Sequence, residues 1–504
     1  MQNLPAILSG MPIKNVQSRD QWKRTTTINT LAEIARQAMI ERGFIPDFPK
    51  DVLIELSSIA APASPRTSPT FRDMRGMLWV SIDNDNSRDL DQLTYAEGNR
   101  IFVAVADVDA LVTRGLPLDL RAAHNTTSVY TPAAIFPMLP PKLSNDLTSL
   151  NENTDRCAIV VEMEVAEDGS FALISVHPAY VRNRAKLTYR NVAGCIEKGI
   201  CLGHLIPSIP GLKKQLALQD KIAQRIEKSR DAQGALEFGI PELEPIIVDG
   251  LAVGLQERTH NRAHSLIENY MIAANVCVTK YLDQKQLPTL RRIVRTPKRW
   301  NRIVSLAKGL GEILPPKPNA KALRAFLLKR KEVEPLTFPE LSLAVIKLIG
   351  RGEYVLGYSR SADLGHFNLA ELEYAHTTAP NRRYPDVIMQ RILKSELYGD
   401  KPPYTKNQLA TIAAHCTLKE ADAEKVERRM VKCAAAMVFS KQIGRQYKAM
   451  VTGVTDRGTW VRLMEVPVEG KLVQGGKDFD VGDYLEVKLV HVDVVKGHID
   501  FHSV

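Results

Sequence analysis

An apolar run ends at Asp83, and a dense group of carboxylates begins there. Asp83, Asp85, Asp89 and Asp91 lie within nine positions, and Arg88 is the one cation among them. Carboxylates this close repel one another and raise each other's pKa unless a cation neutralises them. A hard divalent ion suits such a group, because Mg²⁺ binds carboxylate oxygens together with substrate phosphates. The stretch therefore predicts a loop at the end of a strand that supports metal-assisted chemistry on a phosphate.

Two simpler interpretations of the same stretch stay open at this point. Asp, Asn and Ser are turn formers, so a carboxylate-rich loop is often a solvated turn. A calcium-binding EF-hand loop fits less well, because it requires Gly where Arg88 stands and Glu where Thr94 stands. The metal hypothesis therefore needs support from other parts of the chain.

Length, charge and cysteine content narrow the class of protein. A chain of 504 residues is long enough for roughly two to four domains. The net charge of +10 favours a polyanionic partner, with nucleic acid ahead of a membrane surface. We expect no membrane anchor, because neither a signal-peptide pattern nor a run of about eighteen apolar residues occurs. Cysteine spacing suits neither a zinc site nor a disulfide framework, so we expect free thiols and a cytoplasmic protein. The cysteines are Cys157, Cys195, Cys201, Cys277, Cys416 and Cys433.

Composition and periodicity divide the chain into three parts, and together they predict an α+β protein. Residues 1–70 predict a small helical N-terminal domain, which can be a structural cap or a helix-turn-helix-like contact to nucleic acid. Residues 71–440 mix apolar strands with charged helices and form the main body. Residues 446–504 alternate with strand periodicity between turn signals, which predicts a five-stranded OB-type barrel.

Two aromatic residues of the expected barrel, Trp460 and Tyr447, can offer stacking surface to nucleotide bases. The alternative is that both rings fill the barrel interior, and for Tyr447 we favour the interior.

Several separated blocks, all in the same order, resemble the ribonuclease II (RNB) family of exoribonucleases. The blocks are residues 81–83 with 88–91, 138–140, 143–150, 263–275 and 374–386. The last sixty residues resemble an S1 RNA-binding domain. The resemblance implies a mixed α/β catalytic domain that threads single-stranded RNA 3′ end first. It also implies processive 3′→5′ hydrolysis to nucleoside 5′-monophosphates, dependent on Mg²⁺.

The resemblance also assigns expected roles to individual residues. Asp83, Asp89 and Asp91 match the family's acidic metal-binding positions, and Asp91 and Arg382 are the expected catalytic pair. A planar fork of donors suits Arg382 to a phosphate. The expected RNA contacts follow the same logic, because rings stack on any base and a carboxylate or phenol can bond a 2′-hydroxyl. These contacts are Tyr130 and Phe238 for the bases, Tyr189 and Glu268 for the terminal riboses, and Trp460 in the S1 domain.

The chain departs from the family pattern at three points. Gln92 stands where a fourth aspartate is usual, so we expect it to offer one neutral oxygen to the metal. The expected results are weaker Mg²⁺ affinity, slower turnover or dependence on Mn²⁺. Asn381 precedes the arginine in place of an isoleucine. We also expect the paired N-terminal cold-shock domains of the family to be absent, because the first seventy residues cannot hold them.

Two functions follow from these observations. The first is a single-strand-specific exoribonuclease, and the second is an RNA-binding protein that keeps the scaffold with weak or no hydrolysis. Single-stranded RNA is the expected partner in both cases. We expect neither a membrane partner nor a nucleotide cofactor, and the sequence indicates no oligomeric state.

Overall fold

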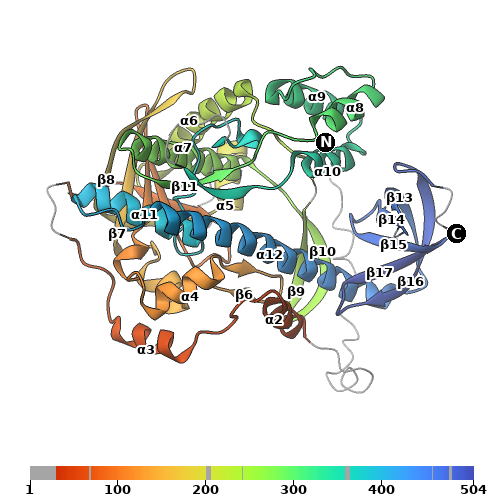
Figure 1. Cartoon of the computed structure of the whole chain (residues 1–504), viewed down its shortest axis with the longest axis horizontal. Coiled ribbons are helices and arrows are strands. Elements are labelled where there is room, and N and C mark those ends of the chain that lie inside the picture. Colours follow the sequence, from red (N-terminus) through yellow and green to blue (C-terminus); the bar gives the residue numbers. More distant parts are fainter. Residues whose placement is uncertain are drawn as a thin grey trace.

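A six-stranded sheet, curled back on itself, forms the core of the main body of the computed structural model and lies at the left in Figure 1. The structure describes residues 30–66, 70–199, 206–240, 242–357, 364–456, 458–475 and 479–504. Residues 1–29 and 67–69 of the expected N-terminal domain lie outside these ranges.

The sheet has the order β1-β8-β2-β3-β4-β7. Strand β8 is 18 residues long and closes the sheet, because its first part pairs with β7 and its last part runs parallel to β2. Apolar residues on β2, β4 and β7 are almost completely buried, as their unbroken apolar runs predict. The strands are β1 (Arg72–Asp73), β2 (Trp79–Asp83), β3 (Gln92–Glu97), β4 (Arg100–Ala106), β7 (Asp155–Val165) and β8 (Phe171–Thr188).

Helices α5 (Tyr189–Lys198), α6 (Leu212–Gln233) and α7 (Arg262–Gln284) pack together against the sheet. Helix α7 begins at the capping residue Asn261, whose side chain accepts the N–H groups of the first turn. Helix α6 ends at Gly234, which adopts φ +101°. Helices α4 (Pro117–Asn125) and α11 (Tyr384–Tyr398) complete the main core with their buried faces.

A second group of helices forms a separate small core around Trp300, Leu323 and Phe338. We call it the helical lobe, and it comprises α8 (Trp300–Gly309), α9 (Ala320–Val333) and α10 (Phe338–Ile349). A short sheet of β11 (Thr289–Ile293) and β12 (Glu353–Gly357) joins the lobe to the body. Two further hairpins are β5 (Val129–Tyr130) with β6 (Ile135–Phe136), and β9 (Glu242–Val248) with β10 (Leu251–Arg258).

The C-terminal residues form a closed five-stranded barrel of order β13-β14-β15-β17-β16, which confirms the OB-type prediction. Tyr447 is 7% exposed and packs on Phe501, so it fills the barrel interior as favoured above. The strands are β13 (Gln446–Thr455), β14 (Gly458–Leu463), β15 (Glu469–Gln474), β16 (Tyr484–Asp493) and β17 (His498–Ser503).

Helix α12 (Lys406–Phe439) is 34 residues long and runs from the body to the barrel (Figure 1). Gly497 fits against it so closely that an added Cβ would lie 2.8 Å from the Cβ of Lys432. Arg462 of the barrel also forms a 2.7 Å ion pair with Glu340 of α10. The barrel is therefore packed on both the long helix and the helical lobe.

The two described N-terminal helices pack on the rest of the chain. Helix α2 (Leu31–Glu41) buries its apolar face against α12, and α3 (Lys50–Ser58) packs beside α4. The fold as a whole is α+β, as predicted. Cys195 is disulfide-bonded, which corrects the expectation of free thiols throughout. Within the described ranges, every helix is too short or too polar to cross a bilayer.

Candidate active site

The acidic loop lies between β2 and β3 and is fixed by side chains from two other segments. Ser149 is completely buried; its hydroxyl accepts the Leu90 N–H (3.0 Å) and donates to the Arg88 carbonyl (2.9 Å). Lys186 Nζ donates to the Ser87 carbonyl at 2.6 Å. One serine therefore holds the backbone on both sides of Asp89, so this loop is fixed by tertiary hydrogen bonds and is not a solvated turn.

Asp91 and Arg382 meet although they are 291 positions apart. Asp91 is 1% exposed; its Oδ1 accepts the Asn381 N–H at 2.8 Å, and its Oδ2 accepts Arg382 Nε at 3.2 Å. Burial raises the pKa of Asp91 to about 7, with Arg382 opposing this rise and Asp89 adding to it. The Arg382 side chain is 42% exposed, so its remaining guanidinium donors are accessible to a ligand.

Asp83 ends β2 and carries an unpaired buried oxygen. Its Oδ2 has no hydrogen-bond partner, whereas its Oδ1 accepts the amide Nε2 of Gln92 at 3.4 Å. Burial raises the pKa of Asp83 to about 6, with Arg382 lowering it and Asp89 raising it. An orphaned carboxylate oxygen, with the Asp89 carboxylate close enough to raise the pKa of Asp83, is a feature that fits a hard divalent cation.

The surroundings of Asp83 and Asp91 define how such a cation would be held. In the part of the chain that the structure describes, no three acidic, histidine or cysteine side chains enclose a metal ion by themselves. This agrees with the behaviour of Mg²⁺, which is usually held by one or two carboxylates together with water and substrate phosphates. The Gln92 amide turns its nitrogen toward Asp83, so its oxygen would face an ion only after a half-turn of the amide.

Tyr130 lies beside the acidic loop, but through its hydroxyl. The Tyr130 hydroxyl donates to Asp89 Oδ2 at 2.6 Å, and its backbone N–H donates to Glu427 Oε1 of α12 at 2.9 Å. Tyr130 as a whole is 38% exposed. The structure therefore places Tyr130 at the acidic loop, where its hydroxyl orients Asp89.

Tyr189 begins α5 directly after Thr188, which pairs with Asp83 in the sheet. Burial and the charge of Asp83 raise the pKa of Tyr189. Its ring stacks on His264 with centroids 3.9 Å apart. Glu268 lies one turn further along α7, half-exposed, 3.7 Å from Arg230 and 3.9 Å from His260.

The other two expected RNA contacts lie elsewhere in the fold. Phe238 packs against the core of the helical lobe. Trp460 lies on β14 of the barrel, partly exposed, with Lys471 Nζ 6.0 Å from its ring centre. Within the described ranges, neither ring has a hydrogen bond or ring contact to the acidic loop. Any contact of these two rings with RNA would therefore lie outside the immediate reaction centre.

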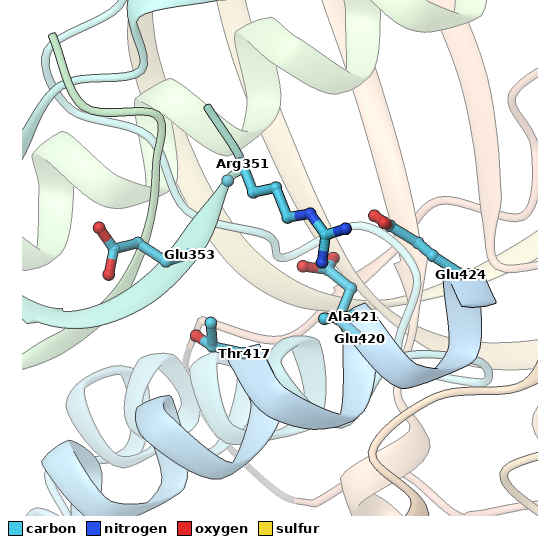
Figure 2. A pocket seen from close by; sticks show the side chains of 7 residues that line it. Arg351, Glu353, Thr417, Glu420, Ala421 and Glu424 are labelled. Atoms are coloured by element: carbon cyan, nitrogen blue, oxygen red, sulfur yellow. The ribbon is translucent and has the colours of Figure 1, made fainter. Parts of the chain in front are cut away.

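A pocket of about 270 Å³ opens between β12 and α12, away from the acidic loop. Figure 2 shows Arg351 extending toward Glu420 and Glu424, whereas Glu353 points away. Glu420 pairs with Arg292 at 2.8 Å, and Glu353 pairs with Arg295. The lining carries more carboxylates than cations, so it would repel a phosphate and is not the candidate active site.

Ser149, Lys186 and His264 are functional neighbours for which the sequence indicated no role. Ser149 and His264 fall within the blocks that carry the family resemblance, which is the one signal that could have marked them. Their contacts depend on tertiary packing, so no local pattern reveals them.

Comparisons with known proteins agree with this geometry. The family model described as RNB domain matches residues 71–399, and the one described as RNase II-type exonuclease C-terminal S1 domain matches residues 445–504. Ribonuclease R of Thermotoga maritima is 30% identical over 90% of this chain and 68% of its own length. Ribonuclease R of Aquifex aeolicus is 28% identical over 94% of this chain and 70% of its own length.

A solved structure shares the fold. Mycoplasma genitalium RNase R in complex with ribose methylated single-stranded RNA superposes with a TM-score of 0.85 at 21% identity. The match covers 94% of this chain and 78% of that chain. Because the RNB domain match spans well over half of the chain and includes the acidic loop, the chain belongs to the RNB family.

Proposed function

We propose that this protein is an exoribonuclease that shortens single-stranded RNA from its 3′ end. The observation that carries the proposal is the convergence of Asp91, Arg382 and the orphaned Asp83 oxygen on one partly exposed site. Membership of the RNB family and similarity to proteins named Ribonuclease R support the same activity. Because single-stranded RNA is its substrate, we propose that it acts in the cytoplasm.

We propose Mg²⁺, with Mn²⁺ as the alternative, as the ion held by Asp83, Asp89 and Asp91. When bound, a divalent ion supplies Lewis acidity toward a phosphate and favours an ionised water at neutral pH. The raised pKa values of Asp83 and Asp91 support this proposal. Burial and the charge of Asp89 disfavour the ionised carboxylates, and a bound cation would stabilise them. Gln92 supplies a donor to Asp83 and no charge.

The chain's own side chains then orient the RNA. Arg382 keeps Nε on Asp91, so its terminal nitrogens are the donors that contact the scissile phosphate. The Tyr130 ring stacks on a base near the 3′ end, while its hydroxyl fixes Asp89. Tyr189 and Glu268 contact the terminal riboses, where a 2′-hydroxyl distinguishes RNA from DNA. We propose that Phe238 and Trp460 grip bases further along the strand, which favours repeated cleavage without release.

The test is an RNA degradation assay that separates exonuclease from endonuclease activity. A 5′-labelled poly(A) with Mg²⁺ or Mn²⁺ is expected to shorten progressively to a short limit product while nucleoside 5′-monophosphates accumulate. The same RNA ligated into a circle has no 3′ end and is expected to stay intact. Cleavage of the circle, or no shortening with either ion, would overturn the proposal.

A second candidate function is RNA binding without efficient hydrolysis. Gln92 is the observation that favours it, because an amide in place of a fourth carboxylate leaves the site one negative charge short. Tight poly(A) binding by a protein that shortens no RNA, and gain of cleavage in Gln92→Asp, would favour this candidate.

A further inference from the structure

The side chain of His264 stacks on the ring of Tyr189. The two rings stack with centroids 3.9 Å apart and an interplanar angle of 15°. They come from different helices, because Tyr189 begins α5 and His264 is in the first turn of α7. A stacked ring on one side limits the orientations that a tyrosine ring can adopt.

The imidazole itself is held from behind. Its Nδ1 lies 2.9 Å from the Asn261 side-chain oxygen and 3.3 Å from the Asn261 backbone nitrogen, so it donates to the oxygen in one tautomer and accepts the N–H in the other. Asn261 in turn caps α7 by accepting the N–H groups of Ala263 and His264. Burial, with the nearby charges of His260 and Arg258, lowers the pKa of His264 to about 4, so the stacked ring is neutral at neutral pH.

The orientation of Tyr189 matters because of what lies on its other side. Thr188 pairs with Asp83, and the charge of Asp83 acts on the Tyr189 hydroxyl. Tyr189 therefore sits between the helix cap and the acidic loop, and a change in its ring angle moves its hydroxyl relative to the RNA terminus.

We infer that His264 is a positioning residue that sets the discrimination between ribose and deoxyribose at the 3′-terminal nucleotide, by fixing the Tyr189 ring through stacking. This rests on the proposed function, in which Tyr189 contacts the terminal sugar. His264 touches neither the RNA nor the metal in this role, and its effect passes through Tyr189.

Two substitutions separate the stacking from the capping of α7. His264→Phe keeps a ring but loses the bond to the Asn261 N–H. His264→Gln loses the ring but keeps a side chain that can accept that N–H, as in a capping box. His264→Ala loses both. His415→Ala, on α12, serves as the matched control for removing a part-exposed helical imidazole.

The readout is the rate of removing the last nucleotide from two RNAs that differ only in a terminal ribose or 2′-deoxyribose. We expect the ribose preference of His264→Phe and His415→Ala to stay within about twofold of the unmodified protein. We expect His264→Gln and His264→Ala to lose it by about two- to tenfold, the range that a stacked aromatic pair supports. Melting temperatures of all variants confirm that each is folded at the assay temperature.

The outcomes distinguish this inference from the proposed function. The inference would be overturned if the ribose preference were kept in His264→Gln and lost in His264→Phe, because it would then depend on the helix cap. A ribose preference unchanged in all variants would overturn it as well. If the unmodified protein shortens neither RNA, the proposed function fails instead. In that case the ribose preference is measured as the ratio of the binding affinities for the two RNAs. Equal affinities of the unmodified protein for both RNAs would overturn the inference too.

Discussion

Asp91→Asn should inactivate the enzyme and at the same time stabilise the metal-free protein. The change removes one negative charge at nearly constant volume, in a side chain that is 1% exposed. The asparagine oxygen can still accept the Asn381 N–H, but the amide nitrogen then faces Arg382 Nε, so one hydrogen bond is lost. The variant loses a proposed metal ligand and the partner that orients Arg382, and we expect RNA hydrolysis to fall at least about 10³-fold.

The stability effect follows from the pKa. Folding raises the pKa of Asp91 from 3.8 to about 7, so above pH 7 the ionised carboxylate opposes folding by up to about 4 kcal/mol. Asparagine carries no such penalty, but a buried unpaired amide donor costs about 1–3 kcal/mol. The net expectation at pH 8 in EDTA is a gain of about 1–3 kcal/mol, or a melting temperature higher by roughly 1–4 °C.

Thermal melts in EDTA and a poly(A) assay in Mg²⁺ test both halves of this prediction. Asp386→Asn is the matched control, because Asp386 is equally buried but pairs with Arg383 at 2.8 Å and accepts the Ala379 N–H. Its replacement leaves the buried Arg383 without its counter-charge and should lower the melting temperature. A lower melting temperature for Asp91→Asn in EDTA would refute the idea that the acidic group is strained without an ion.

Three further predictions concern the same group. Because folding raises the pKa of Asp83 to about 6 and of Asp91 to about 7, the folded state keeps protons that the unfolded chain loses above about pH 4. Metal-free stability should therefore fall from about pH 4 to 7, and Mg²⁺ should raise the melting temperature more at pH 8 than at pH 5.5. Equal Mg²⁺ effects at both pH values would contradict this. Gln92→Asp should lower the Mg²⁺ concentration that gives half-maximal hydrolysis, and an unchanged requirement would place Gln92 outside the ion's reach. Tyr130→Phe keeps the ring but frees Asp89, so it should raise the Mg²⁺ concentration needed for half-maximal hydrolysis with little change in RNA affinity. Tyr130→Ala should raise that concentration and also lower RNA affinity. A Mg²⁺ titration and filter binding measure the two quantities.

Sequence patterns predicted the elements around the acidic loop well, because their signals are local. The strands before and after Asp91 follow apolar runs, and turn residues mark the loop between them. Helix starts are harder to predict from sequence. Helix α12 begins at Lys406, where its first turns expose polar residues and bury only isolated positions such as Leu409. Helix α7 begins at the cap supplied by Asn261, ahead of its apolar run.

The reaction centre was predictable only through family resemblance. Nothing local connects Asp91 to Arg382, because their contact depends on how α11 packs under the sheet. The orientation of side chains was beyond either approach. The Tyr130 hydroxyl on Asp89 and the Gln92 nitrogen facing Asp83 are rotamer choices made by neighbouring residues in space. Both contacts change the expected role of the residue without moving it out of the site.

The long helix α12 links the C-terminal barrel mechanically to the acidic loop. At one point along it Glu427 holds the backbone of Tyr130, and less than two turns later Cys433 meets the barrel at the Val495 carbonyl. Exchanging the barrel for an unrelated RNA-binding module would therefore disturb the segment that orients Asp89. Such a domain exchange should therefore lower the turnover rate as well as the RNA affinity.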